Sequence, residues 1–231
     1  MKEISILKLA WFWIWRSLLG ALVGLLLIII WYLFSILIFR NFLDIPFDEF
    51  GIAINLDQTM IDSYVRIFAL AISFPIGLAI YVYCKSNFQV RVFQRILGEE
   101  DELVQWADQS AYGAFFGATI LVSLNYLMDD IDLPYFLLPL PNAAFVLIMA
   151  IFQWRILRKY FSEAYIWFVI AVMVMSLHWI NLELSEALFS MDSLTPILFS
   201  AFIVWPLMAL LIQTFGIVLL SKTSMSDPDP Y

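Results

Sequence analysis

Few side chains in this sequence suit catalysis or metal binding, and most of them lie near one predicted end of its apolar segments. They are Arg66, Asn125, Asp129, Asp130, His178, Asn181 and Glu183. Brought together by folding, such groups would suit a cation or a polar substrate. However, the spacing from His178 to Asn181 and the acids beyond matches no metal-ligand pattern. The sequence therefore favours a structural, hydrogen-bonded histidine over a ligand or a catalytic base.

Within the apolar segments themselves, ionisable residues are almost absent. Arg66 lies four residues after Asp62, which places both on one face of a helix as a local ion pair. No predicted span carries an acid at its centre, and this counts against a proton- or sodium-coupled pump. Among the polar residues within spans, Gln213 is the best candidate for lining a polar cavity.

Sequence motifs of enzymes and cofactor sites are missing. The chain has no Gly-x-Ser-x-Gly, no His-Glu-x-x-His and no glycine loop that would cradle a phosphate. Its single cysteine, Cys84, cannot form an internal disulfide and is interpreted as a small buried hydrophobe. We therefore expect no catalytic residue, no cofactor and no metal.

The composition shows what kind of elements must position these residues. Of 231 residues, 63% are hydrophobic, 17% aromatic and only 14% charged, with a net charge of −8. Soluble domains are typically about 45–50% apolar and about 25% charged. These values exclude an ordinary soluble domain, a disordered chain and a nucleic-acid binder. They predict an all-α, polytopic transmembrane bundle.

Six segments are apolar and long enough to cross a bilayer, for which about 20 residues of helix are needed. The predicted spans are residues 18–39, 65–83, 111–128, 141–158, 164–182 and 196–220. Pro206 is expected to bend the last span. Residues 133–140 are left open as a loop or a half-buried piece. Residues 85–110 are predicted to form a cytoplasmic amphipathic segment, and residues 223–231 a disordered tail.

The distribution of basic residues predicts the orientation of the chain. Ten of the twelve lysines and arginines fall on one side: Lys2, Lys8, Arg16, Lys85, Arg91, Arg95, Arg155, Arg158, Lys159 and Lys222. The positive-inside rule then places both termini in the cytoplasm. We expect Trp11, Trp13 and Trp15 at the inner membrane boundary, where indole rings are favoured. The compact loops favour a bacterial cytoplasmic (inner) membrane.

Two pairs of glycines four residues apart clear one face of a helix for close packing. They are Gly20 with Gly24 and Gly113 with Gly117. Packing within the chain is favoured, and contact with another subunit is the alternative. Neither pair indicates chemistry.

Three functions remain open from the sequence. The first is a non-enzymatic, multi-pass membrane subunit that anchors, scaffolds or assembles a larger complex. Its partners would be the lipid bilayer and a protein partner or second copy, contacted through the glycine faces and amphipathic segments, with no nucleic acid. The second is a small solute transporter or channel component, whose prolines would break helices. The third is an intramembrane enzyme that uses His178 or the outer acids.

Overall fold

The computed structural model of the protein describes residues 5–43, 69–97, 101–129, 140–174, 176 and 205–222. Helices account for nearly all of this part, and it contains no strand, which confirms the predicted all-helical class. The elements are α1 (Ile6–Leu43), the π-helix η2 (Ala69–Ser73), α3 (Phe74–Leu97), the 3₁₀ helix η3 (Asp101–Val104), α4 (Gln105–Asp129), α5 (Leu140–Leu157), a helical segment at 166–174, and α8 (Trp205–Leu220).

Three described helices are long and apolar enough to cross a membrane. They cover Ile6–Ser35, Gln105–Leu127 and Leu140–Leu157, and Leu207–Leu220 is a shorter apolar helix. This fits the expectation of a helical membrane protein. The predicted second, fifth and sixth spans each extend into residues outside the described part, so the count of six stays a prediction, as does the bend at Pro206.

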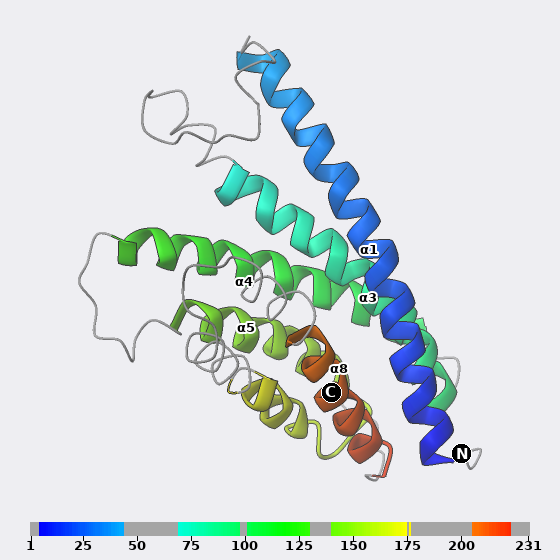
Figure 1. The fold of residues 1–231 in the computed structure, drawn as a ribbon. Coiled ribbons are helices and arrows are strands. Elements are labelled where there is room, and N and C mark those ends of the chain that lie inside the picture. Colours follow the sequence, from blue (N-terminus) through cyan, green and yellow to red (C-terminus); the bar gives the residue numbers. More distant parts are fainter. Residues whose placement is uncertain are drawn as a thin grey trace, which may run out of the picture.

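Neighbouring helices pack side by side in chain order. Helix α1 lies along α3, α3 along α4, and α4 along α5, while α8 returns to contact α1. The α1–α3 pair is antiparallel, because Gly20 and Gly24 meet Lys85 and Tyr81 in reverse order. The α4–α5 pair is antiparallel too, because Gly113 and Gly117 meet Met149 and Phe145 in reverse order. The helices converge at the end where the N-terminus lies, and α1 and α4 diverge from there (Figure 1).

At the convergent end, four buried aromatic residues form a chain of edge-to-face contacts that we call the aromatic base. Its members are Trp13, Phe93, Trp106 and Trp167, with successive ring centroids 5.7, 4.9 and 5.6 Å apart. They come from α1, α3, α4 and the 166–174 helix. Edge-to-face geometry brings the positive ring edge against the negative ring face, which adds to the gain from burial. The base therefore joins four helices through one packed core.

The three indoles near the start of α1 lie in different environments, and their predicted depth at the inner membrane boundary stays a prediction. Trp13 is 0% exposed, whereas Trp11 and Trp15 are 67% and 51% exposed. Residues two apart on a helix point to nearly opposite sides, so the three indoles cannot share one environment. Trp13 faces the bundle core, and its two neighbours face outward.

The described residues of the predicted amphipathic segment, 85–97 and 101–110, belong to regular helices, and their cytoplasmic location stays a prediction. Residues 85–97 are the second part of α3, which runs from Phe74 to Leu97, and α4 begins at Gln105 directly after η3. The apolar face is present, with Val92 and Phe93 buried and Arg91 and Arg95 exposed. This face packs within the bundle, in the same core cluster as Trp13 and Trp106.

All four glycines of the two predicted pairs lie where helices approach closely within the chain. A Cβ atom on Gly20 would come within 2.7 Å of the Lys85 Cα, and one on Gly24 within 2.8 Å of the Tyr81 carbonyl oxygen. On the α4–α5 side, a Cβ on Gly113 would lie 2.9 Å from the Met149 Cα, and one on Gly117 3.0 Å from the Phe145 carbonyl oxygen. Side chains at these positions would force the helix backbones apart.

The start of α3 carries an irregularity with a local cause. Pro75 has no N–H to donate to a carbonyl one turn earlier, and the π-helix η2 ends just before it, at Ser73. The Trp31 indole N–H donates to the Ser73 carbonyl at 2.9 Å, and the Ser73 hydroxyl donates to Ser35 Oγ at 3.0 Å. Polar contacts thus link α1 to η2, far from the aromatic base.

Candidate ligand-binding cavity

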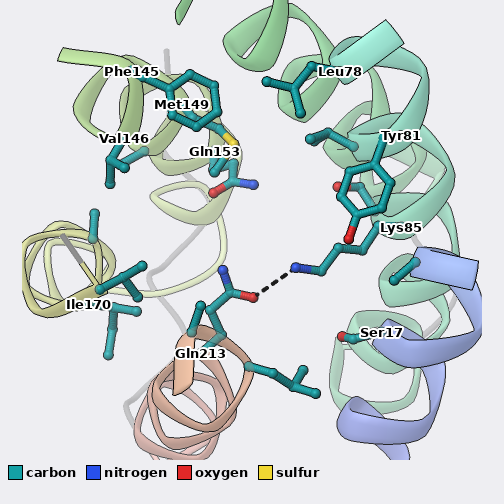
Figure 2. Close-up of a pocket in the computed structure, with 18 of the residues that line it drawn as sticks. Ser17, Leu78, Tyr81, Lys85, Phe145, Val146, Met149, Gln153, Ile170 and Gln213 are labelled. Carbon is teal, nitrogen blue, oxygen red and sulfur yellow. Dashed lines mark hydrogen bonds between the residues drawn. The ribbon is translucent and has the colours of Figure 1, made fainter. Parts of the chain in front are cut away.

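A cavity of about 630 Å³ lies among the helices (Figure 2). It adjoins the aromatic base, because Trp167 belongs to its lining. Its described walls come from α1, α3, α4, α5, the 166–174 helix and α8. Ligand pockets in proteins typically measure about 300–1,000 Å³. The cavity is therefore large enough for a small organic molecule.

The wall far from the aromatic base is mainly apolar. Helix α3 runs toward the base and contributes Phe74 and Leu78 first; α5 runs the same way and contributes Phe145 and Val146. Asn142, in the first turn of α5, is the polar exception in this region. An alkyl or aromatic group would be well surrounded here.

Closer to the base the lining changes character, and we call this part the polar floor. It consists of Ser17, Lys85, Ser86, Gln89, Gln153 and Gln213. Each lies nearer to the base along its own helix than the apolar residues of that helix that line the cavity. The cavity therefore has an apolar end and a polar end.

Three residues of the polar floor, Ser17, Gln89 and Gln153, hold helices together. The Gln89 amide donates to Ser17 Oγ at 2.9 Å and so links α3 to α1. Gln153 donates to Ser110 Oγ at 3.0 Å and accepts from the Trp167 indole at 2.8 Å, which links α5 to α4 and to the 166–174 helix. Because these buried groups pair with one another across helices, they stabilise the bundle.

Lys85 and Gln213 differ from that group. Lys85 extends from α3 across the cavity, and its ammonium donates to Gln213 Oε1 on α8 at 3.4 Å (Figure 2). An ammonium has three N–H donors, and this long bond uses one of them. None of the described residues that line the cavity is acidic, and none places a carboxylate within ion-pairing distance of Lys85. Lys85 is thus a cation in the cavity without a counter-charge among the described residues.

The position of Gln213 in the cavity agrees with its prediction as a cavity-lining residue. From the sequence alone, Lys85 is interpreted only as one of the bases that mark the cytoplasmic side. A usable signal was present in the sequence, since Leu78, Tyr81, Lys85 and Gln89 recur every three or four residues and so share one face of a helix. A lysine in the middle of such an inward face indicates an interior cation.

Most residues of the predicted polar cluster, at the end of the spans opposite the basic residues, lie outside the part of the chain that the structure describes. Arg66, Asp130, His178, Asn181 and Glu183 lie outside the described residues. Asn125 is exposed on α4, and Asp129 is the last residue of that helix. Their convergence on a cation or substrate therefore stays a prediction.

The chemistry available in the described cavity is that of binding. Among its polar groups are the Lys85 cation and the Gln213 carboxamide, which can hold an acceptor-rich ligand by charge and hydrogen bonds; Tyr81, Ser86 and Asn142 add neutral polar groups to the lining. In the described part of the chain, no three His, Cys, Asp or Glu side chains come together as a metal site. Comparisons with protein-family models, curated proteins and solved structures find no significant match to this chain.

Proposed function

We propose that this chain is a non-enzymatic integral membrane protein that binds an amphipathic small molecule between its helices. The supporting observation is the cavity, because one space of about 630 Å³ joins an apolar end to a polar floor. A molecule with an alkyl chain and a polar headgroup matches both ends at once. In such a molecule the chain gains from burial, and the headgroup gains hydrogen bonds.

We further propose six spans with both termini in the cytoplasm. Ten lysines and arginines belong to described helices or turns. Eight of them lie in the half of their helix, or in the turn, nearest the aromatic base: Lys8, Arg16, Arg91, Arg95, Arg155, Arg158, Lys159 and Lys222. Lys85 lies at the middle of α3, and Arg40, near the opposite end of α1, is the exception. Basic residues concentrate on the cytoplasmic side of membrane proteins. The polar floor would then face the inner leaflet.

A membrane-impermeant label tests this orientation. A tag after Tyr231 is expected to react only after the cells are permeabilised, whereas a tag in an outer loop at Asp48 reacts in intact cells. Labelling of the Tyr231 tag in intact cells would contradict the proposed topology.

Retention of one amphiphile per chain tests the proposed function. The full chain, purified in mild detergent, is incubated with dodecanol or dodecanoate and analysed by native mass spectrometry. We expect a saturable one-to-one complex. The variant Leu78→Trp places a large ring in the apolar end and is expected to abolish the complex, while Leu33→Trp, at an exposed site on α1, retains it.

Two checks keep this test independent of folding. The melting temperature and elution volume of Leu78→Trp must match those of Leu33→Trp, and Val146→Phe provides a second obstruction on the opposite wall. A complex that persists in both obstructed variants would place the amphiphile elsewhere and reject the proposed function.

The second candidate is a subunit that anchors, scaffolds or assembles a larger membrane complex. The observation that favours it is the outer face of α1, on which large apolar side chains are exposed at helical spacing: Leu22, Leu26, Ile29, Leu33 and Leu37. Lipid or a partner helix would cover such a face. Purification from native membranes discriminates, because a scaffold brings a stoichiometric partner, and a partner-free monomer with full cellular function contradicts it.

A further inference from the structure

The polar floor of the cavity has an unbalanced charge. It contains the Lys85 ammonium and, among the described lining residues, no carboxylate. Removing a cation from water is costly unless an anion or several hydrogen bonds replace its hydration. In the described structure that replacement amounts to one contact of 3.4 Å with Gln213. A ligand with a negative group at this position would supply the counter-charge that the described lining residues lack.

Gln213 adds directional hydrogen-bond donors to this site. Its Oε1 accepts from Lys85, so its amide nitrogen is left with two N–H donors, neither of which has a partner among the described residues. The two side chains come from α8 and α3 and point toward each other across the cavity (Figure 2). Together they present donors to one small volume. An oxyanion, with several lone pairs, can accept from both.

The distance from this pair to the apolar end suits a single alkyl chain. Leu78 lies seven residues before Lys85, and Phe74 lies eleven residues before it. At a rise of ~1.5 Å per residue, these separations correspond to ~10 and ~16 Å along α3. An alkyl chain that starts at Lys85 would therefore pass the apolar wall over most of its length. The neutral hydrogen bonds of Gln89 and Gln153 flank the headgroup and contribute no opposing charge.

We propose that Lys85 and Gln213 bind the anionic headgroup, a carboxylate or a phosphate, of a single-chain amphiphile whose tail occupies the apolar end of the cavity. This inference rests on the proposed function and specifies its ligand. Lys85 supplies the charge and Gln213 supplies a directional donor. Neutral amphiphiles would fill the same space without the charge-assisted bond, and cationic ones would be repelled.

The test compares headgroups on the same tail. Dodecanoate, dodecyl phosphate, dodecanol and dodecyltrimethylammonium are titrated against the full chain in nanodiscs of a zwitterionic lipid, with one-to-one complexes counted by native mass spectrometry. We expect the two anions to bind about tenfold to a hundredfold more tightly than the alcohol, as for hydrogen bonds to charged groups. Tight binding by only one of the anions would support the proposal and identify the headgroup.

Variants separate a charge effect from packing. Lys85→Gln is expected to reduce the preference for dodecanoate over dodecanol to about threefold or less, and to leave dodecanol binding within about twofold. Lys85→Arg keeps the charge and most of the preference. Arg91→Gln removes an exposed cation of the same helix outside the cavity and should leave the preference unchanged.

The outcomes distinguish the inference from the function beneath it. Equal affinity of the wild-type chain for dodecanoate, dodecyl phosphate and dodecanol would overturn the inference and leave the amphiphile site in place. A full preference for anions in Lys85→Gln would also overturn it. Failure of all four probes to bind the wild-type chain would overturn the proposed function and the inference with it. The wild-type comparison needs no variant, so poor folding of a variant leaves the test decisive.

Discussion

The aromatic base and the cavity lie next to each other and share Trp167, yet they use their residues in opposite ways. In the base, large side chains from four helices meet ring against ring, and Trp13, Phe93 and Trp106 are almost fully buried. In the cavity, the same helices leave about 630 Å³ unfilled and place a cation there. Protein interiors are normally close-packed. We infer that packing in the aromatic base stabilises the bundle, and that the cavity is where the bundle binds its ligand.

The largest contrast is expected from one substitution made in both regions, phenylalanine to alanine. Phe93 is 0% exposed and contacts the rings of Trp13 and Trp106, so Phe93→Ala should reduce the free energy of unfolding by about 3–5 kcal/mol. Phe145 lines the cavity and is only partly buried, so Phe145→Ala should cost less than half as much. Unfolding in detergent, followed by circular dichroism, measures both. Equal losses would remove the distinction between the regions.

Glycine-to-alanine substitutions sharpen the comparison where α1 meets α3. Gly20→Ala would bring a methyl group within 2.7 Å of the Lys85 Cα, which only a shift of the helix backbones can relieve. We expect a loss of about 1–3 kcal/mol. It should also weaken amphiphile binding, because Lys85 moves with its backbone.

Gly77→Ala is the matched control on α3. The nearest atom there is Cγ1 of the Ile28 side chain at 3.0 Å, and a side chain can rotate away. Alanine also favours a helix over glycine by about 1 kcal/mol, so the net change should be near zero. A loss at Gly77 as large as that at Gly20 would show that backbone contact is not the cause.

The smallest expected effect is a difference between two tryptophans of the aromatic base, Trp167, which also lines the cavity, and Trp106, which does not. The Trp167 indole N–H donates to Gln153 beside the cavity, whereas the Trp106 indole N–H is buried without a partner in the described structure. Trp167→Phe leaves a buried carbonyl oxygen of Gln153 short of one donor and should cost about 1–2 kcal/mol more than Trp106→Phe. Thermal unfolding of the pair in one detergent tests this, and a larger loss for Trp106→Phe would contradict the assignment.

The helical class and three helices long and apolar enough to span a membrane were predictable from the sequence, because they depend on composition and periodicity. The sequence also identified Gly20, Gly24, Gly113 and Gly117, since a missing side chain acts locally, and it singled out Gln213. Two features were not predicted from the sequence: that Trp13 is buried in the bundle, and that the Lys85 side chain points into the cavity. Both depend on how each helix is rotated against its neighbours, which requires tertiary contacts that lie far apart in the sequence, such as that between Lys85 and Gln213.

The most direct test of the account is to locate each end of a bound amphiphile. Two photoreactive analogues of dodecanoate are used, one with a diazirine beside the carboxylate and the other with a diazirine at the tail, and the labelled residues are mapped by mass spectrometry. The account predicts that the first labels α3 and α8 near Lys85 and Gln213, and that the second labels the wall around Leu78 and Phe145. The reverse pattern, or labelling confined to the outer face of α1, would contradict it.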